Sequence, residues 1–267
     1  MLTDRYDRHI DYLRISVTDR CNLRCEYCNP VHRMRLLKPA DILSFEEVFQ
    51  VAATAVELGV RKLRITGGEP LVRRGVVQLV AMLSRLDGVE ELAMTSNAVL
   101  LPRYAQSLKD AGLHRVNISL DTLDPGRFAA LTGGGDVNKV IAGIEAAVTA
   151  GLTPVKLNCV IDESPEEEDA RLVQQFALQR GLEARFIRRM DINSGRFWVV
   201  DGGTGGDCSR CNRLRLTCDG QLKPCLFNDL SFNVRELGAR EAVLAAVAAK
   251  PRCGGASRDG SFQTIGG

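Results

Sequence analysis

The sequence predicts an α/β fold in which six βα units form an incomplete barrel, followed by a small cysteine-rich C-terminal unit. Short β-rich stretches alternate with longer segments of helical periodicity, which is typical of parallel strands joined by helices. The strands are apolar on one face only, whereas strands covered on both faces read as nearly continuous apolar runs. The nine cysteines fall largely into two clusters, one near each end of the chain.

The six strands are predicted from short alternating runs that end before turn residues. They cover residues 12–17, 62–66, 92–96, 115–120, 155–160 and 184–188. A first helix is expected to begin after Ser44, which forms a capping box with Glu47, and to end near residue 58 before Gly59. Further helices are predicted over residues 76–85, 103–111, 137–150, 165–180 and 234–250.

Successive strand residues point to opposite faces of a sheet, which divides the predicted strands into two surfaces. One surface is apolar and is expected to pack under the helices: Leu13, Ile15, Val17, Leu63, Ile65, Val116, Ile118, Leu120, Val155 and Leu157. The other surface is polar and cationic: Arg14, Ser16, Thr18, Lys62, Arg64, Thr66, Thr95, Asn97, Asn117, Ser119, Asp121, Lys156, Asn158 and Arg185. A closed eight-stranded barrel is filled by branched apolar side chains. Six curled strands would instead leave an open polar cleft, and the alternative is an open sheet with one solvated face.

The domain organisation follows from composition. Residues 1–192 hold the six βα units, residues 193–207 form a Gly-rich linker, and residues 208–267 form the C-terminal unit. The net charge of +2 is too small to argue for a nucleic acid or a membrane as partner, and neither is expected. The first twenty residues alternate charges without an apolar block, which predicts no secretory signal and a cytoplasmic location.

Cys21, Cys25 and Cys28 lie on a predicted loop after the first strand with the spacing C-x3-C-x2-C. An odd number of cysteines favours metal binding or reactive thiols over a disulfide framework. A structural zinc site needs four protein ligands, and no histidine completes this triplet. Three thiolates can instead hold three corners of a cubane iron–sulfur cluster and leave one iron open. Zinc and inert thiols are the alternatives, and Cys159 and Cys253 are expected to be structural.

The segment Cys21-Asn-Leu-Arg-Cys-Glu-Tyr-Cys28 resembles the signature of radical S-adenosylmethionine enzymes, and Gly67-Gly68-Glu69-Pro70 is similar to their segment that binds the methionine amino group. The resemblance implies a six-unit partial barrel, a [4Fe-4S] cluster on the three cysteines, and S-adenosylmethionine as cofactor. Carried over by position, S-adenosylmethionine contacts fall on Tyr27, Gly68, Glu69, Thr95, Ser119 and Met190. For Met190, a packing role is the alternative.

Within that superfamily, three segments resemble the GTP 3′,8-cyclase family of molybdenum cofactor biosynthesis: residues 13–22, residues 211–217 and the tail Gly266-Gly267. The resemblance implies a second [4Fe-4S] cluster on Cys208, Cys211 and Cys225, with an iron free to bind guanine. It places GTP contacts on Arg14, Lys62, Arg64, Lys156, Arg185, Arg213 and Arg215. The implied reaction begins when a 5′-deoxyadenosyl radical removes the 3′ hydrogen of GTP, and it ends with a bond from C3′ to C8 of guanine.

The same resemblance implies a reducing electron donor protein, and a cyclic pyranopterin monophosphate synthase that uses the product; it leaves a homodimer open. The sequence departs from the family in three ways. The segment before the C-terminal cysteines is much shorter, Arg188 replaces a glutamate, and Cys218 adds a thiol that is able to complete a fully ligated cluster or a four-cysteine zinc site. Two other functions stay open. One is a radical enzyme acting on a different substrate, such as a peptide or another nucleotide, and the other is an inactive paralogue that binds GTP or a partner protein.

Overall fold

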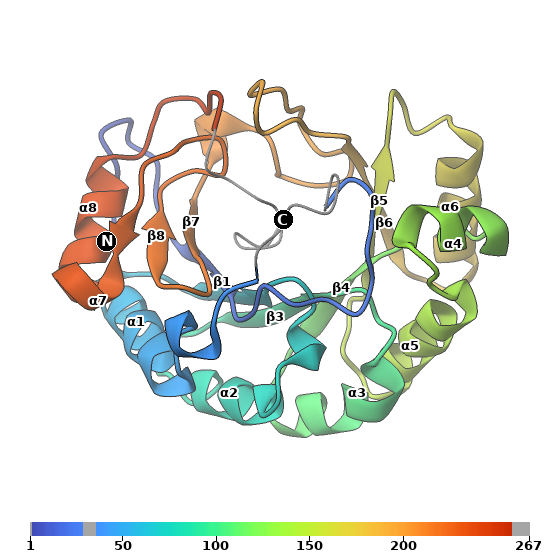
Figure 1. Cartoon of the computed structure of the whole chain (residues 1–267), viewed down its shortest axis with the longest axis horizontal. Coiled ribbons are helices and arrows are strands. Elements are labelled where there is room, and N and C mark those ends of the chain that lie inside the picture. The colour runs from blue at the N-terminus through green and yellow to red at the C-terminus, as the bar shows by residue number, and fades with distance from the viewer. Residues whose placement is uncertain (1, 29–35, 258–267) are drawn as a thin grey trace.

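The computed structural model of the chain describes residues 2–28 and 36–257. Six parallel strands curl into an open barrel with the helices on its outer face (Figure 1). The strands are β1 (Tyr12–Ser16), β2 (Lys62–Thr66), β3 (Glu91–Ser96), β4 (Arg115–Ser119), β5 (Lys156–Ile161) and β6 (Glu183–Arg188). Each lies within one residue of its predicted bounds, which confirms the α/β class and the six βα units.

The sheet continues beyond the six predicted strands. Three further strands were not predicted: β7 (Arg213–Leu216), β8 (Gln221–Lys223) and β9 (Phe232–Asn233). The strand order is β6-β5-β4-β3-β2-β1-β7-β8-β9, with β7 parallel to β1 and the last two strands antiparallel. The C-terminal cysteine region is therefore built onto the open edge of the barrel sheet. The division of the chain at residue 193 stays a prediction.

The helices cover the convex face of the sheet (Figure 1). Five are the predicted ones: α1 (Phe45–Leu58), α2 (Val76–Leu83), α3 (Leu101–Asp110), α5 (Val137–Thr149) and α6 (Glu168–Gln179). Helix α1 opens with the predicted capping box, and Gly59 caps its C-terminal end. Helix α4 (Pro125–Thr132), capped by Asp124, was not predicted.

The prediction of one helix over residues 234–250 is wrong. The structure has a short helix α7 (Val234–Leu237) and a separate helix α8 (Ala239–Ala248). Gly238 separates them with φ 79° and ψ 155°, a conformation outside the helical region that glycine adopts without steric cost. None of the helices in the described ranges is long and apolar enough to cross a membrane.

The two faces of the sheet differ as predicted. The apolar face is fully buried under the helices, with Leu13, Ile15, Leu63 and Ile65 inaccessible to solvent. The opposite face is also largely buried, but it carries guanidinium, hydroxyl and amide groups, including those of Arg14, Arg64 and Asn117. Because buried charges are costly unless something compensates them, this inner face needs a polar ligand rather than a packing partner.

Candidate active site

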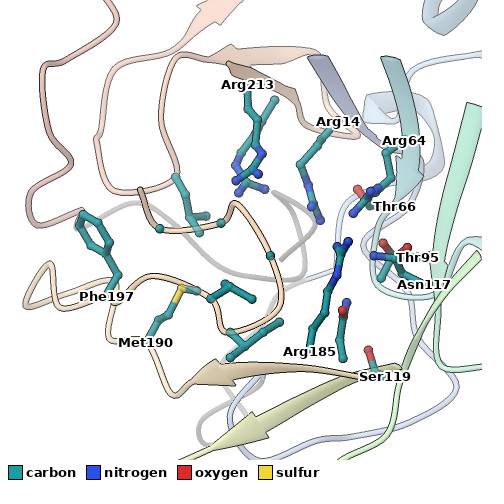
Figure 2. A pocket seen from close by; sticks show the side chains of 18 of the residues that line it. Arg14, Arg64, Thr66, Thr95, Asn117, Ser119, Arg185, Met190, Phe197 and Arg213 are labelled. Carbon is teal, nitrogen blue, oxygen red and sulfur yellow. The ribbon is translucent and has the colours of Figure 1, made fainter. Parts of the chain in front are cut away.

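The inner face of the barrel lines one cavity of about 530 Å³, which lies in the size range of small-molecule sites (Figure 2). Both cysteine trios line it, the first from the loop after β1 and the second from the segment around β7. Most other predicted site residues also line it: Arg14, Lys62, Arg64, Arg185, Arg213, Arg215, Tyr27, Gly68, Thr95, Ser119 and Met190. Groups that lie far apart in the sequence therefore face one another across a single space.

A row of three arginines crosses the barrel wall between the two trios. In the sheet register, Arg14 lies directly opposite Arg64 on one side and Arg215 on the other. The side chains of Arg14, Arg64, Arg185 and Arg213 converge on the cavity (Figure 2). Like charges opposite each other in a sheet are destabilising, so this row is suited to a ligand with several negative charges. A triphosphate has that character, and guanidinium groups bind phosphate oxygens in pairs.

Burial and mutual repulsion disfavour the charged form of these arginines. The pKa of Arg215 falls to about 10, chiefly because the group is buried and secondarily because Arg213 is near. The pKa values of Arg64 and Arg185 are also lowered, again chiefly by burial, with Arg115 contributing repulsion to both. Among the described residues, the Nε atoms of Arg64, Arg185 and Arg213 are buried without a hydrogen-bond acceptor. These donors are available to a bound anion.

Tyr12 organises the row and was missed by the sequence analysis. The guanidinium carbons of Arg64 and Arg213 lie 5.3 Å and 5.7 Å from the centre of its ring, so the ring stands between two cations. The signal was present, because Tyr12 falls on the same strand face as Arg14. Arg115 was also missed; it lines the cavity and forms a two-point ion pair with Glu91 at 2.9 and 2.7 Å.

The two predicted lysine contacts differ. Lys62 lines the cavity, but its ammonium group is paired with Asp11 at 3.0 Å. Lys156 is not among the lining residues, and its ammonium group pairs with Glu183 at 2.5 Å. Lys156 lies in register with Asn117, which does line the cavity, so its place along the strand does not exclude it; the ion pair with Glu183 holds its ammonium group elsewhere.

The glycines after β2 allow this segment to lie against the loop that carries the first cysteines. The backbone N–H groups of Gly68 and Glu69 donate to the carbonyls of Thr18 and Arg20, both at 2.8 Å. A Cβ on Gly67 would lie 2.6 Å from the Thr18 carbonyl oxygen, and one on Gly68 would collide with the carbonyl of Arg20. Side chains are therefore excluded at both positions, so the backbone of this segment faces the cavity.

Glu69 does not line the cavity, unlike Gly68. Its buried carboxylate accepts hydrogen bonds from the backbone of Leu71 and Asn97 and from the hydroxyl of Ser96, at 2.7 to 3.1 Å. Burial raises the pKa of Glu69 to about 7 despite these bonds. The carboxylate therefore fixes the end of β3, and with it Asn97, whose amide donates to the Cys21 sulfur at 3.6 Å.

The first three thiols are half-buried, and burial raises the pKa of Cys25 and of Cys28 to about 12. Tyr27 between them donates a hydrogen bond to Asp121 at 2.6 Å, which fixes the loop against β4. Within the described ranges, no three His, Cys, Asp or Glu side chains are grouped tightly enough to hold a single metal ion. The corners of a cubane are farther apart than the ligands of one ion. Three thiols on one loop, facing a polar cavity, fit an iron–sulfur cluster better than a zinc ion.

The second trio comes from the opposite strand ends to the first: the first follows β1, whereas Cys208 and Cys211 precede β7, which is parallel to β1. Cys208 begins a short 3-10 turn, Cys211 follows it, and Cys225 comes after β8. Burial alone would raise the pKa of Cys211, but the nearby charges of Lys250 and Arg213 outweigh it and lower the pKa. All three thiols line the cavity, so an iron–sulfur cluster held there would face the bound ligand.

The remaining cysteines separate into different environments. Cys218 is fully buried beside Ser16 and does not line the cavity, so the alternatives that gave it a place in the second metal site lack support. Cys159 is buried and structural, as predicted. The same prediction for Cys253 is wrong: this thiol is exposed, and its sulfur lies 3.3 Å from that of Cys208.

The segment 193–207, predicted as a linker, forms a wall of the cavity. Phe197 stacks on Phe227 with ring centres 4.4 Å apart, and Arg188 lies over the ring of Trp198 at 4.4 Å. A backbone bridge joins Asp201 to Phe186 of β6. Arg188, the cation that departs from the family pattern, therefore anchors this wall. The predicted Gly266-Gly267 tail lies outside the described residues.

Comparison with protein families matches the Radical SAM superfamily over residues 15–176 and the Molybdenum Cofactor Synthesis C family over residues 166–251. Relatives named GTP 3′,8-cyclase include that of Alkaliphilus oremlandii, 37% identical over 298 aligned positions that cover 94% of this chain and 93% of the relative. The Pseudomonas putida relative is 43% identical and covers 88% of this chain and 84% of the relative.

Solved structures of the same fold are more distant in sequence. Streptococcus suis SuiB bound to precursor peptide SuiA superposes with a TM-score of 0.68 at 16% identity, covering 91% of this chain and 66% of that one. Native anSMEcpe with bound AdoMet gives a TM-score of 0.66 at 13% identity, covering 90% of this chain and 81% of that one. At these identities the likeness supports the partial-barrel fold and nothing finer.

Proposed function

This chain belongs to the radical S-adenosylmethionine superfamily and, within it, to the GTP 3′,8-cyclase family, and we propose that it converts GTP to (8S)-3′,8-cyclo-7,8-dihydroguanosine 5′-triphosphate. This lyase reaction is the first step of molybdenum cofactor biosynthesis. The observation that carries the proposal is the arginine row of Arg215, Arg14 and Arg64, which lies between two cysteine trios in one cavity.

The cofactors of the family, two [4Fe-4S] clusters and S-adenosylmethionine, fit the donor sets of the cavity. We assign the first cluster to Cys21, Cys25 and Cys28 and the second to Cys208, Cys211 and Cys225. When bound, the first cluster and S-adenosylmethionine supply the 5′-deoxyadenosyl radical that removes the 3′ hydrogen of GTP. The protein supplies position and excludes competing reactions.

S-adenosylmethionine is assigned to the side of the cavity that the first trio lines. Tyr27, Gly68, Thr95 and Ser119 line the cavity, and each is proposed as a contact. Met190 also lines the cavity, but it packs on the apolar cluster of Ile192, Leu226 and Phe227 beside Cys225, which favours the packing alternative for this residue. Glu69 is proposed as a positioning residue rather than a contact, because its carboxylate is turned to the backbone beside β3. The buried hydroxyl of Thr95 has no partner among the described residues and is available to this ligand.

GTP is assigned to the cationic side. Arg14, Arg64, Arg185, Arg213 and Arg215 would bind the triphosphate and orient the nucleotide beside the second trio. Lys62 is proposed as a peripheral contact because it is already paired with Asp11. Lys156 is the weakest of the proposed contacts, since its charge is neutralised by Glu183 outside the cavity lining.

A test uses the reconstituted chain under anaerobic reduction with S-adenosylmethionine and GTP. The proposal expects 5′-deoxyadenosine and the cyclised nucleotide in equal amounts. 5′-Deoxyadenosine without cyclised product would identify a radical enzyme with another substrate. No cleavage of S-adenosylmethionine at all would identify an inactive paralogue.

The partners beyond GTP are proposed from the chemistry of the reaction and not from the cavity. A reducing electron donor protein is required by the radical chemistry, and the product would pass to a cyclic pyranopterin monophosphate synthase. The cytoplasmic location and a homodimer stay predictions from the sequence.

A further inference from the structure

Lys250 is a buried lysine directly behind the second cysteine trio. It follows the C-terminal end of α8, and only 1% of its surface is exposed. Its ammonium group donates hydrogen bonds to the carbonyl oxygens of Arg213 at 2.6 Å and Pro224 at 2.7 Å. Its charge is near enough to the Cys211 sulfur to contribute to the lowered pKa of that thiol. One side chain thereby connects the residues that flank two proposed cluster ligands.

A buried ammonium group is costly unless an anion compensates it. In the part of the chain that the structure describes, no carboxylate lies within ion-pair distance of Lys250. The groups that attract its charge are the sulfurs of Cys211 and Cys225. A [4Fe-4S] cluster held by three thiolates carries net negative charge, so the position of Lys250 is explained if it faces such a cluster.

The neighbouring buried cation has a different arrangement. Arg8 is paired with Asp4 at 2.7 Å, and it donates to the backbone carbonyls of Cys208, Pro251 and Arg252. Arg8 therefore holds the backbone around the trio, and its charge is neutralised within its own pair. Arg8 and Lys250 are the two buried cations next to this trio, and only the charge of Arg8 is neutralised by a carboxylate among the described residues. The charge of Lys250 faces the sulfurs instead.

We propose that Lys250 is a positioning residue that holds Cys211 and raises the reduction potential of the second iron–sulfur cluster. Hydrogen bonds to the sulfurs and the local charge set the potential of such clusters. The cation favours the more negative, reduced state. The inference rests on the proposed assignment of that cluster to Cys208, Cys211 and Cys225.

The test compares the reconstituted full chain with Lys250→Met and Lys250→Gln in anaerobic redox titrations followed by electron paramagnetic resonance. Addition of S-adenosylmethionine identifies the signal of the first cluster, which serves as the internal reference. Lys250→Met should lower the ratio of reduced to oxidised second cluster about tenfold at a fixed potential, equivalent to about 59 mV for one electron. Lys250→Gln keeps a donor without the charge and should fall between. The matched control is Lys109→Met, since Lys109 is exposed and also donates to a backbone carbonyl.

An unchanged ratio for the second cluster in Lys250→Met, or an equal change in both clusters, would overturn the inference. Lys250→Met could instead lose the iron of the second cluster while keeping the first cluster and its melting temperature, and that result would support the positioning role. The reduction potential of the second cluster would then be measured in Lys250→Gln. A wild-type chain that binds iron for one cluster only would instead overturn the proposed function. Iron and sulfide analysis of the wild type separates these two failures.

Discussion

Replacing Arg64 with methionine should raise the free energy of unfolding of the ligand-free protein and weaken its binding of GTP. Arg64 is 7% exposed and lies opposite Arg14 in the sheet. Methionine keeps most of the volume and removes the charge. A residue that only stabilised the fold would change both quantities in the same direction, so opposite changes identify a residue held for its ligand.

The size of each effect follows from the geometry. If the two charges came as close as the strand spacing of about 5 Å, they would repel by about 3 kcal/mol at an effective dielectric constant near 20, which is the upper limit for this pair. The lost interaction with the Tyr12 ring offsets about 1 kcal/mol. The free energy of unfolding without GTP should therefore rise by up to about 2 kcal/mol. Loss of a buried charge-assisted contact should weaken GTP binding by about 2 kcal/mol or more, which is roughly 30-fold.

The assay is urea unfolding of the cluster-loaded chain without GTP, combined with equilibrium dialysis of GTP under anaerobic conditions. Arg127→Met is the control, because Arg127 is a half-exposed arginine on α4 that pairs with Glu168 and Asp169. The control should leave GTP binding unchanged. A GTP dissociation constant that stays within twofold in Arg64→Met, or a stability loss above about 1 kcal/mol, would refute the reasoning.

Four further predictions address other parts of the site. Arg213→Ala and Arg215→Ala should abolish the cyclised product while cleavage of S-adenosylmethionine continues; quantifying both products by mass spectrometry checks this, and normal product from both variants would remove these residues from the GTP site. The pKa of Glu69 in the folded state is raised to about 7, so its contribution to stability is fully present below pH 4.5 and is lost as the pH rises through 7. The free energy of unfolding should therefore fall by up to about 3 kcal/mol over this range. Urea titrations at pH 5 and pH 8 measure the fall, which should be absent in Glu69→Gln. Cys218→Ser should keep the full iron content because this thiol is buried away from the cavity, and loss of half the iron would contradict that placement. Gly68→Ala should reduce binding of S-adenosylmethionine at least tenfold, because the added methyl group meets the carbonyl of Arg20; equilibrium dialysis measures it, with unchanged binding as the contrary result.

The sequence predicted the parts of the fold that depend on local pattern. Strand bounds, the capping box at Ser44 and the two faces of the sheet follow from alternation and from short-range hydrogen bonding. Strands β7 to β9 could not be predicted in this way, because they are short and acquire their partners through β1, some two hundred residues earlier. The break at Gly238 was hidden because the residues on both sides of it have high helix propensity.

The site was predictable where the strand face alone decides whether a side chain reaches the cavity. Alternation gives the face, and it was correct for Arg14, Arg64 and Arg185. The partner that a side chain finds depends on the neighbouring strand, which single-strand patterns do not contain. Lys156 has the correct face and lies in register with Asn117, but its ammonium group pairs with Glu183 on the next strand. Tyr12 acquires its role from the arginines of the two strands beside it.

The short segment 193–207 is sufficient as a wall because the second trio is anchored elsewhere. The alignment with the Alkaliphilus oremlandii relative spans 298 positions, while 94% of this chain is about 251 residues, so about 47 positions have no counterpart here. If those residues held the second trio in place, their loss would leave it without support. Instead, β7 is hydrogen-bonded to β1, which fixes Arg213 and Arg215 in register with Tyr12 and Arg14 whatever the length of the preceding segment. The register of the cationic row is thus a property of the sheet, and the wall adds to it a hydrogen bond from the Arg213 guanidinium to the hydroxyl of Thr204 at 2.9 Å.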